Sequence, residues 1–115
     1  MKKVLVIAEA GVNHDGNLEQ ALALVDAASE VGADIVKFQT FKASSLVTDF
    51  APKARYQLLN TPSIESQLTM LKKLELTHEM HVDIINRCSA LNIEFLSTGF
   101  DIESLEFLSS LKMAR

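Results

Sequence analysis

The sequence predicts an α/β fold built on a parallel β-sheet, and three features of the chain indicate it. Short runs rich in β-branched and aromatic residues, typical of strands, occur at 4–8, 34–40 and 93–98. The first run, VLVIA, is continuously apolar, as in strands that are buried on both faces. Segments with the apolar spacing of helices lie between the runs. Helical connections imply that neighbouring strands are parallel and joined by right-handed crossovers.

Local signals delimit the first helix. Asn17 is suited to cap it, and Gln20, three residues later, would complete a capping box. Gly32 is expected to end the helix. The apolar side chains that recur at three- and four-residue steps are Leu18, Leu22, Val25, Ala28 and Val31.

The rest of the chain alternates in the same way. A connection at 41–61 is long enough to be a functional or mobile loop. Helices are predicted at 63–74, at 77–91 with Thr77 as the N-cap, and from Asp101, which caps the last helix, to 111.

The faces of the second predicted strand distinguish two parallel-sheet architectures. Because side chains alternate along a strand, Lys37 and Gln39 face one side and Phe38 faces the other. An open sheet covered by helices on both faces would bury Lys37, whereas the lumen of a barrel accommodates it. The segment EAGVNHDG also lacks the G-x-G-x-x-G spacing of a dinucleotide-binding open sheet. We therefore predict the N-terminal portion of a (β/α)8 TIM barrel, incomplete in this chain.

Composition limits the classes of function. The chain has 115 residues, at most one ordinary domain, and its 48% hydrophobic and 23% charged residues exclude a disordered chain. A net charge of −4 supplies no basic surface for nucleic acid. The single cysteine cannot form an internal disulfide, the apolar run after MKK is too short for a signal peptide, and no stretch approaches a membrane span. We expect a cytoplasmic protein without nucleic-acid or membrane partners.

Two charged residues at predicted strand ends are the sharpest candidates for chemistry. Lys37 would bind phosphate or carboxylate, or form a Schiff base, and the alternative is a snorkelling lysine paired with Glu9 or Asp34. Glu9 would act as a general acid or base or bind a polyol, and the alternative is an ion pair across neighbouring strands.

Weaker candidates lie nearby. Asn13 and His14 either line a site or stabilise their own turn, and Thr98 either joins an anion site or caps the next helix. His78 and His81, in HEMH, lack the H-E-x-x-H spacing of a zinc site and are predicted to be surface residues.

Two further groups have less specific predictions. Cys88 follows the helical spacing of core residues and is predicted to be buried rather than nucleophilic. The long connection has side chains that either close over an anionic substrate or are simply solvated, namely Lys42, Lys53, Arg55 and Tyr56.

Three segments together resemble the sialic acid synthase family, the N-acetylneuraminate synthases and their bacterial relatives that make legionaminic and pseudaminic acids. The segments are IAEAGVNHDGNLEQALALVDAASEVGADIVKFQTF, then ESQLTMLKKLEL, then IEFLSTGFD. The similarity extends over nearly all 115 residues, and the long connection is closer to the bacterial branch, of the legionaminate type.

The resemblance implies a (β/α)8 barrel followed by a small antifreeze-like domain in a homodimer. Members of the family condense phosphoenolpyruvate with N-acetylmannosamine or a diacetamido hexose and release phosphate. A divalent metal, manganese or magnesium, polarises the sugar aldehyde, and its ligands are expected outside this chain. By motif, Lys37 and Thr98 would bind phosphoenolpyruvate, Gln39 would bind the sugar, and Glu9 would be the catalytic residue on the sugar side.

The match to the family is incomplete in two respects. Gly99 stands where the family commonly has proline, which would loosen the turn beside the anion site. Residues 1–115 correspond to about three β/α units, so the later strands and the antifreeze-like domain are not included. Asn13 and His14 match the motif and are expected to shape the first β–α loop. The 115 residues alone are predicted to be inactive and poorly soluble, because the first or third strand would be an open sheet edge with unpaired backbone groups.

Two alternatives stay open at this point. One is a truncated, non-catalytic remnant that folds only with a partner half-barrel. The other is a related phosphoenolpyruvate-dependent sugar-acid phosphate synthase, against which the NHDG loop argues.

Overall fold

Three parallel strands form the single sheet of the part of the chain that the computed structural model describes, residues 3–46 and 64–115. The strands are β1 (Ile7–Gly11), β2 (Ile35–Thr40) and β3 (Glu94–Gly99), and β2 lies in the middle. Both neighbouring pairs are parallel, as the helical connections predicted. Within these residues β1 and β3 each have one edge without a partner strand.

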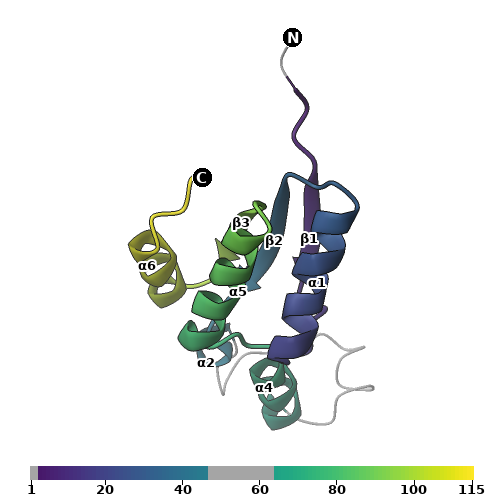
Figure 1. Cartoon of the computed structure of the whole chain (residues 1–115). Helices are drawn as coiled ribbons and strands as arrows, with labels where there is room; N and C mark the ends of the chain where they lie inside the picture. The colour runs from purple at the N-terminus through teal and green to yellow at the C-terminus, as the bar shows by residue number, and fades with distance from the viewer. Residues whose placement is uncertain (1–2, 47–63) are drawn as a thin grey trace.

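Helices connect the strands, and the longest two lie side by side over one face of the sheet (Figure 1). The helices of the described residues are α1 (Leu18–Glu30), α2 (Ala43–Leu46), α4 (Ile64–Lys73), α5 (His78–Ala90) and α6 (Ile102–Ser110), of which α1 and α5 are the longest two. The guanidinium of Arg87 in α5 donates to both carboxylate oxygens of Asp26 in α1, at 2.7 and 2.8 Å. This bidentate pair joins α1 to α5 above the core.

The core lies between the sheet and the α1–α5 layer. It contains Ala10, Ala21, Val25, Ala28, Val36, Phe38, Leu76, Ile84, Cys88, Ile93 and Phe95. The predicted alternation along β2 is confirmed, because Phe38 is buried in this core while Lys37 and Gln39 are half-buried on the other face. The α/β class with a parallel sheet, arranged as the first units of a barrel, is therefore confirmed.

The predicted caps are present, but one prediction about them is wrong. Asn17, Thr77 and Asp101 cap α1, α5 and α6. The capping box fails because the Gln20 amide donates to the Asn13 carbonyl at 3.3 Å. The Asn17 N–H, which the box would have used, already donates to the His14 carbonyl at 2.9 Å.

The first strand differs from its prediction. Its pairing with β2 begins at Ile7 opposite Ile35, so the strand starts three residues later than the apolar run. Val4 and Leu5 are 80% and 46% exposed instead of buried on both faces. The physical reason is that β1 is an edge strand in the described residues. Just before it, the Val6 carbonyl accepts from the amides of Asp34 and Ile35, and the Val6 N–H donates to the Asp34 carboxylate.

The long connection is described only at its start, where α2 occupies Ala43–Leu46. Its remaining part, with Lys53, Arg55 and Tyr56, lies outside the described residues. Among the helices in the described part of the chain, none has the length and hydropathy needed to cross a bilayer.

Candidate active site

Four of the predicted site residues lie on one face of the sheet, two in the middle of their strands and two next to the C-terminal ends. Glu9 in β1 is opposite Lys37 in β2, and Gln39 in β2 is opposite Thr98 in β3. Opposed residues of parallel strands project to the same side, and alternation puts Lys37 and Gln39 on one face. Glu9, Lys37, Gln39 and Thr98, named here the strand-end cluster, therefore share the face opposite to the α1–α5 layer.

Glu9 and Lys37 form an ion pair in which Nζ lies 3.1 Å from Oε2. Their side chains are 50% and 34% exposed, so water screens the pair. Such a pair contributes at most about 1 kcal/mol to stability. Either group can thus turn to a ligand at small energetic cost. The pairing that the sequence left as an alternative is present, and it is compatible with ligand binding.

The side chains of Glu9 and Gln39 both approach Gly11, which lies at a bulge in β1. The register shifts between Glu9 and Gly11, and Gly11 has a φ of +55°. A Cβ at Gly11 would lie 3.2 Å from Glu9 Oε1 and 3.7 Å from Gln39 Nε2. Glycine therefore serves two needs here, the left-handed backbone and the space that the carboxylate and the amide share.

The first β–α loop places its two candidates differently. Asn13 is exposed, and its N–H donates to the Ala10 carbonyl at 3.0 Å within a turn. His14 is fully buried against Phe38, on the helix side of β2. Its Nδ1 accepts a hydrogen bond from the Gly16 N–H at 2.8 Å, so the proton is assigned to Nε2, which has no partner. Burial lowers the pKa of His14.

Thr98 is exposed on the face of the cluster, and it does not cap α6, because Asp101 does. Next to it, Gly99 ends β3 beneath α6. A Cβ at Gly99 would lie 2.8 Å from the Cδ2 of Leu105. Gly99 thus permits a close approach of α6.

His81 is not a surface residue, which corrects the prediction. It is fully buried on α5, and its ring is perpendicular to that of Phe107 at a centroid distance of 5.0 Å. Nε2 lies 2.8 Å from the Thr40 hydroxyl, which lies 2.6 Å from the Ser97 hydroxyl. Burial lowers the pKa of His81. His78 is exposed as predicted and stacks on Phe107 at 3.7 Å.

Sequence reasoning did not predict the buried hydrogen bonds that join Thr40 to Ser97 and to His81. Both are buried and belong to the helix-facing side of their strands. A signal was available, since a hydroxyl on the apolar side of a buried strand needs a hydrogen-bond partner.

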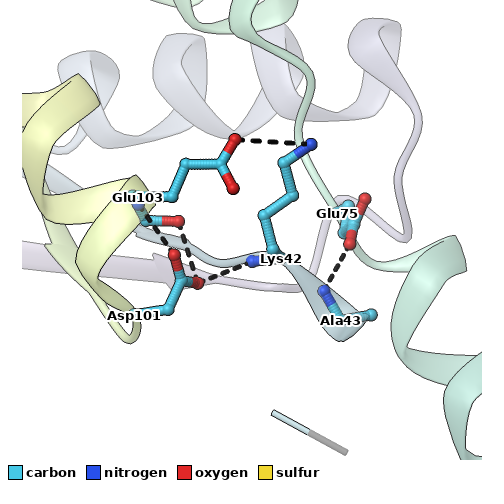
Figure 2. A network of polar contacts seen from close by, with 6 residues as sticks. Lys42, Ala43, Glu75, Asp101 and Glu103 are labelled. Atoms are coloured by element: carbon cyan, nitrogen blue, oxygen red, sulfur yellow. Dashed lines mark hydrogen bonds and ion pairs between the residues drawn. The ribbon is translucent and has the colours of Figure 1, made fainter. Parts of the chain in front are cut away.

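A second polar network anchors the chain where it leaves β2 (Figure 2). The Lys42 N–H donates to Asp101 Oδ2 at 2.7 Å, and the Ala43 N–H donates to the Glu75 carboxylate. Lys42 Nζ lies 3.9 Å from Glu103, on α6. Burial acts to raise the pKa of Asp101, but the hydrogen bonds from Lys42 and Ser104 outweigh it and lower the pKa. Carboxylates from two other segments thus fix the start of the β2–α2 connection.

Two kinds of site find no support among residues 3–46 and 64–115. Cys88 is buried as predicted, and burial raises the pKa of its thiol to about 11, which disfavours a nucleophilic thiolate. In those ranges no three His, Cys, Asp or Glu side chains lie together as metal ligands.

Known proteins similar to this chain agree with the fold and motifs. It is 51% identical over 111 residues to an N,N'-diacetyllegionaminic acid synthase of Campylobacter jejuni, covering 96% of this chain and 33% of that protein. It is 54% identical over 110 residues to the enzyme of that name from Legionella pneumophila, covering 96% and 31%. A sialic acid synthetase structure from Leptospira borgpetersenii matches with a TM-score of 0.79 at 26% identity, covering 97% and 34%.

The chain thus spans about a third of the length of each of these relatives. Residues 24–115 match the NeuB family. With its parallel sheet and its match across most of its length, this chain belongs to the NeuB family.

Proposed function

We propose that the strand-end cluster is part of the substrate site of a nonulosonate synthase, which condenses phosphoenolpyruvate with an N-acetylated hexosamine. The observation that carries the proposal is the half-exposed Glu9–Lys37 pair, on the same face as Gln39 and Thr98. A cation and a hydroxyl suit an anionic phosphate ester, and a carboxylate and an amide suit the hydroxyl groups of a sugar. The similarity to legionaminic and sialic acid synthases supports this substrate class.

Each side chain has a distinct role in this proposal. Lys37 leaves Glu9 for the anionic groups of phosphoenolpyruvate, and the Thr98 hydroxyl donates to the same ligand. Gln39 donates its amide hydrogens to a sugar oxygen. Glu9, released from Lys37, accepts hydrogen bonds on the sugar side and can hold a proton there. The enol carbon bonds to the aldehyde carbon, whose oxygen takes up a proton. Water adds to the phosphate-bearing carbon and loses a proton, and inorganic phosphate leaves with cleavage of its C–O bond as the keto group forms.

A divalent metal would supply polarisation of the sugar aldehyde. The described residues do not fit such an ion, because no three ligand side chains meet and Glu9, the acidic member of the strand-end cluster, is paired with Lys37. We therefore assign no residue of this chain to the metal. Its ligands are proposed to lie in the later strands of the complete barrel.

The acceptor is proposed to be a diacetamido hexose rather than N-acetylmannosamine. The support is that two relatives with more than half of their aligned residues identical to this chain are named N,N'-diacetyllegionaminic acid synthase. The part of the sugar site present here consists of Gln39 and Glu9, which would contact groups common to both sugars.

A chimera tests the function, because the chain spans about a third of its relatives. Residues 1–115 replace the homologous segment of the Legionella pneumophila synthase, and phosphate release is measured with phosphoenolpyruvate and each sugar. We expect release with both sugars and a higher kcat/KM for the diacetamido hexose. A folded chimera that releases no phosphate, while the unmodified synthase does, would contradict the proposal.

A further inference from the structure

We propose that His81 is a positioning residue for the strand-end cluster, acting through the buried hydroxyls of Thr40 and Ser97. The three side chains form a continuous hydrogen-bonded chain between α5, β2 and β3, named here the His81 relay. The inference rests on the proposed function, because it assigns the relay the task of holding Gln39 and Thr98 at the spacing that the substrates need.

The donors and acceptors of the relay can be assigned from its geometry. Nδ1 of His81 lies 2.7 Å from the Thr77 carbonyl oxygen, which can only accept. Nδ1 therefore holds the proton in the neutral ring, and Nε2 accepts from the Thr40 hydroxyl at 2.8 Å. The Thr40 oxygen is then free to accept from the Ser97 hydroxyl at 2.6 Å. All of these bonds run in one direction, from β3 through β2 to α5.

All three side chains of the His81 relay are buried, so their hydrogen bonds matter for stability. His81 is fully buried, and Thr40 and Ser97 are 4% and 7% exposed. A buried hydroxyl without a partner costs more than a typical hydrogen bond contributes, so each of the three groups depends on the next. The rings of Phe95 and Phe107 are close to perpendicular to the imidazole, at centroid distances of 6.3 and 5.0 Å, and pack against it.

The relay lies directly behind two members of the strand-end cluster. Thr40 follows Gln39 in β2, and Ser97 precedes Thr98 in β3. Because side chains alternate, each relay hydroxyl projects from the face opposite to its neighbour in the cluster. The Thr40–Ser97 hydrogen bond therefore joins the two strands at the residues adjacent to Gln39 and Thr98. The Phe100 N–H also donates to the Thr40 carbonyl at 3.1 Å, where the two strands end.

Loss of the acceptor on α5 should affect the site more than the fold. Without Nε2, the Thr40 hydroxyl loses its fixed acceptor and the Thr40–Ser97 bond loses its direction. Substrate sites require side chains to be held within about 0.5 Å by supporting hydrogen bonds. Both Gln39 and Thr98 would then be less well placed, so the apparent affinity for both substrates should fall.

Three variants of the chimera test the relay. His81→Phe keeps a buried ring but removes both nitrogens, whereas His81→Gln keeps an acceptor within reach of Thr40. His78→Phe is the matched control, because His78 precedes His81 on α5, stacks on Phe107 and lies outside the relay. All are assayed well below their melting temperatures.

We expect His81→Phe to raise KM for both substrates about fivefold to tenfold, as for the loss of one or two hydrogen bonds, with kcat changed less than twofold. His81→Gln should restore most of the affinity, and His78→Phe should leave KM unchanged. If His81→Phe fails to fold, Ser97→Ala removes the relay from the β3 end and should raise KM in the same direction. Unchanged KM in a folded His81→Phe or Ser97→Ala chimera would overturn the proposal.

Hydrogen exchange separates this proposal from the proposed function. If the unsubstituted chimera releases no phosphate, the proposed function fails, but backbone exchange still reports on the relay. Exchange at 36–41 and 94–100 should be faster in His81→Phe than in the unsubstituted chimera, with no change at 7–11 or in His78→Phe. Equal exchange at these strand ends would overturn the positioning role.

Discussion

Glu9 and Lys37 face each other in the middle of neighbouring parallel strands, and their charged atoms lie 3.1 Å apart. The pair is half-exposed and lies on the face opposite to the α1–α5 layer. A carboxylate and an ammonium that neutralise each other before substrate arrives avoid the cost of two unpaired charges. Both remain available to separate ligands, an anion for Lys37 and a hydroxyl-bearing sugar for Glu9.

Substitution of Glu9 separates its roles in stability and in activity. In the chimera, Glu9→Gln should change the free energy of unfolding by less than about 1 kcal/mol, since the pair is screened by water. The same change should lower kcat/KM by roughly 10²-fold, the low end of the effect of a positioned acid or base. Denaturant titration and phosphate release measure the two effects. A loss of stability with full activity would show that the pair is only structural.

Two glycines with positive φ should respond very differently to alanine. Gly32 has a φ of +80°, and a Cβ added there would meet no other atom within 4 Å. A Cβ at Gly16, in contrast, would lie 1.9 Å from the Lys73 carbonyl oxygen. Gly32→Ala should therefore cost only the backbone term, about 1 kcal/mol. Gly16→Ala should cost about 3 kcal/mol or more, because it must also displace the end of α4.

Thermal unfolding of the two alanine variants in the chimera checks this order. Gly32→Ala serves as the matched control, since both glycines share the left-handed backbone conformation. Similar melting temperatures for the two variants would mean that the first β–α loop does not pack against Lys73 as described.

The two buried histidines predict a loss of stability on mild acidification. Burial lowers the pKa of both His14 and His81 from the ordinary value of 6.5, so the unfolded chain binds more protons just below that pH. Both histidines are neutral in the folded and the unfolded chain above pH 6.5, where they do not reduce stability. The free energy of unfolding then decreases as the pH falls from 6.5 toward the folded-state pKa values. The slope is at most about 1.4 kcal/mol per pH unit for each histidine.

The contribution of His81 is isolated by comparing the chimera with its His81→Gln variant between pH 8 and pH 5. The variant should lose less stability over this interval, because its buried side chain does not titrate. Three carboxyl groups also have a lowered pKa, namely Asp26, Asp34 and Asp101. They reduce stability only at lower pH, as the pH falls below their ordinary pKa of 3.8. Parallel stability curves for the two proteins would contradict the assignment.

Local features of the fold could be predicted from the sequence, and features that depend on distant partners could not. The caps Asn17, Thr77 and Asp101 each bind an amide three residues away, so their residue type and position were sufficient. The burial of His81 depends on Thr40, 41 residues away, and a local pattern does not contain that contact. The exposure of Val4 and Leu5 similarly depends on the neighbours of β1.

In the candidate site, too, the features set within one strand could be predicted, and those set by pairing between strands could not. Alternation along β2 placed Lys37 and Gln39 together, because a strand has a period of two residues. The register that sets Glu9 opposite Lys37, and the approach of Glu9 and Gln39 to Gly11, follow from pairing between strands. Sequence reasoning therefore left the Glu9–Lys37 contact as one of two alternatives.

The affinity of phosphoenolpyruvate for the chimera, with and without the Lys37 ammonium, tests directly whether Lys37 binds this substrate. Titration calorimetry of Lys37→Gln is compared with Lys42→Gln, in which the lysine near Glu103 and outside the strand-end cluster is changed in the same way. Loss of a charge-assisted contact should weaken binding by about 10- to 100-fold in Lys37→Gln and leave Lys42→Gln unchanged. Equal affinity in Lys37→Gln and the unsubstituted chimera would contradict the assignment of this strand end as the phosphoenolpyruvate site.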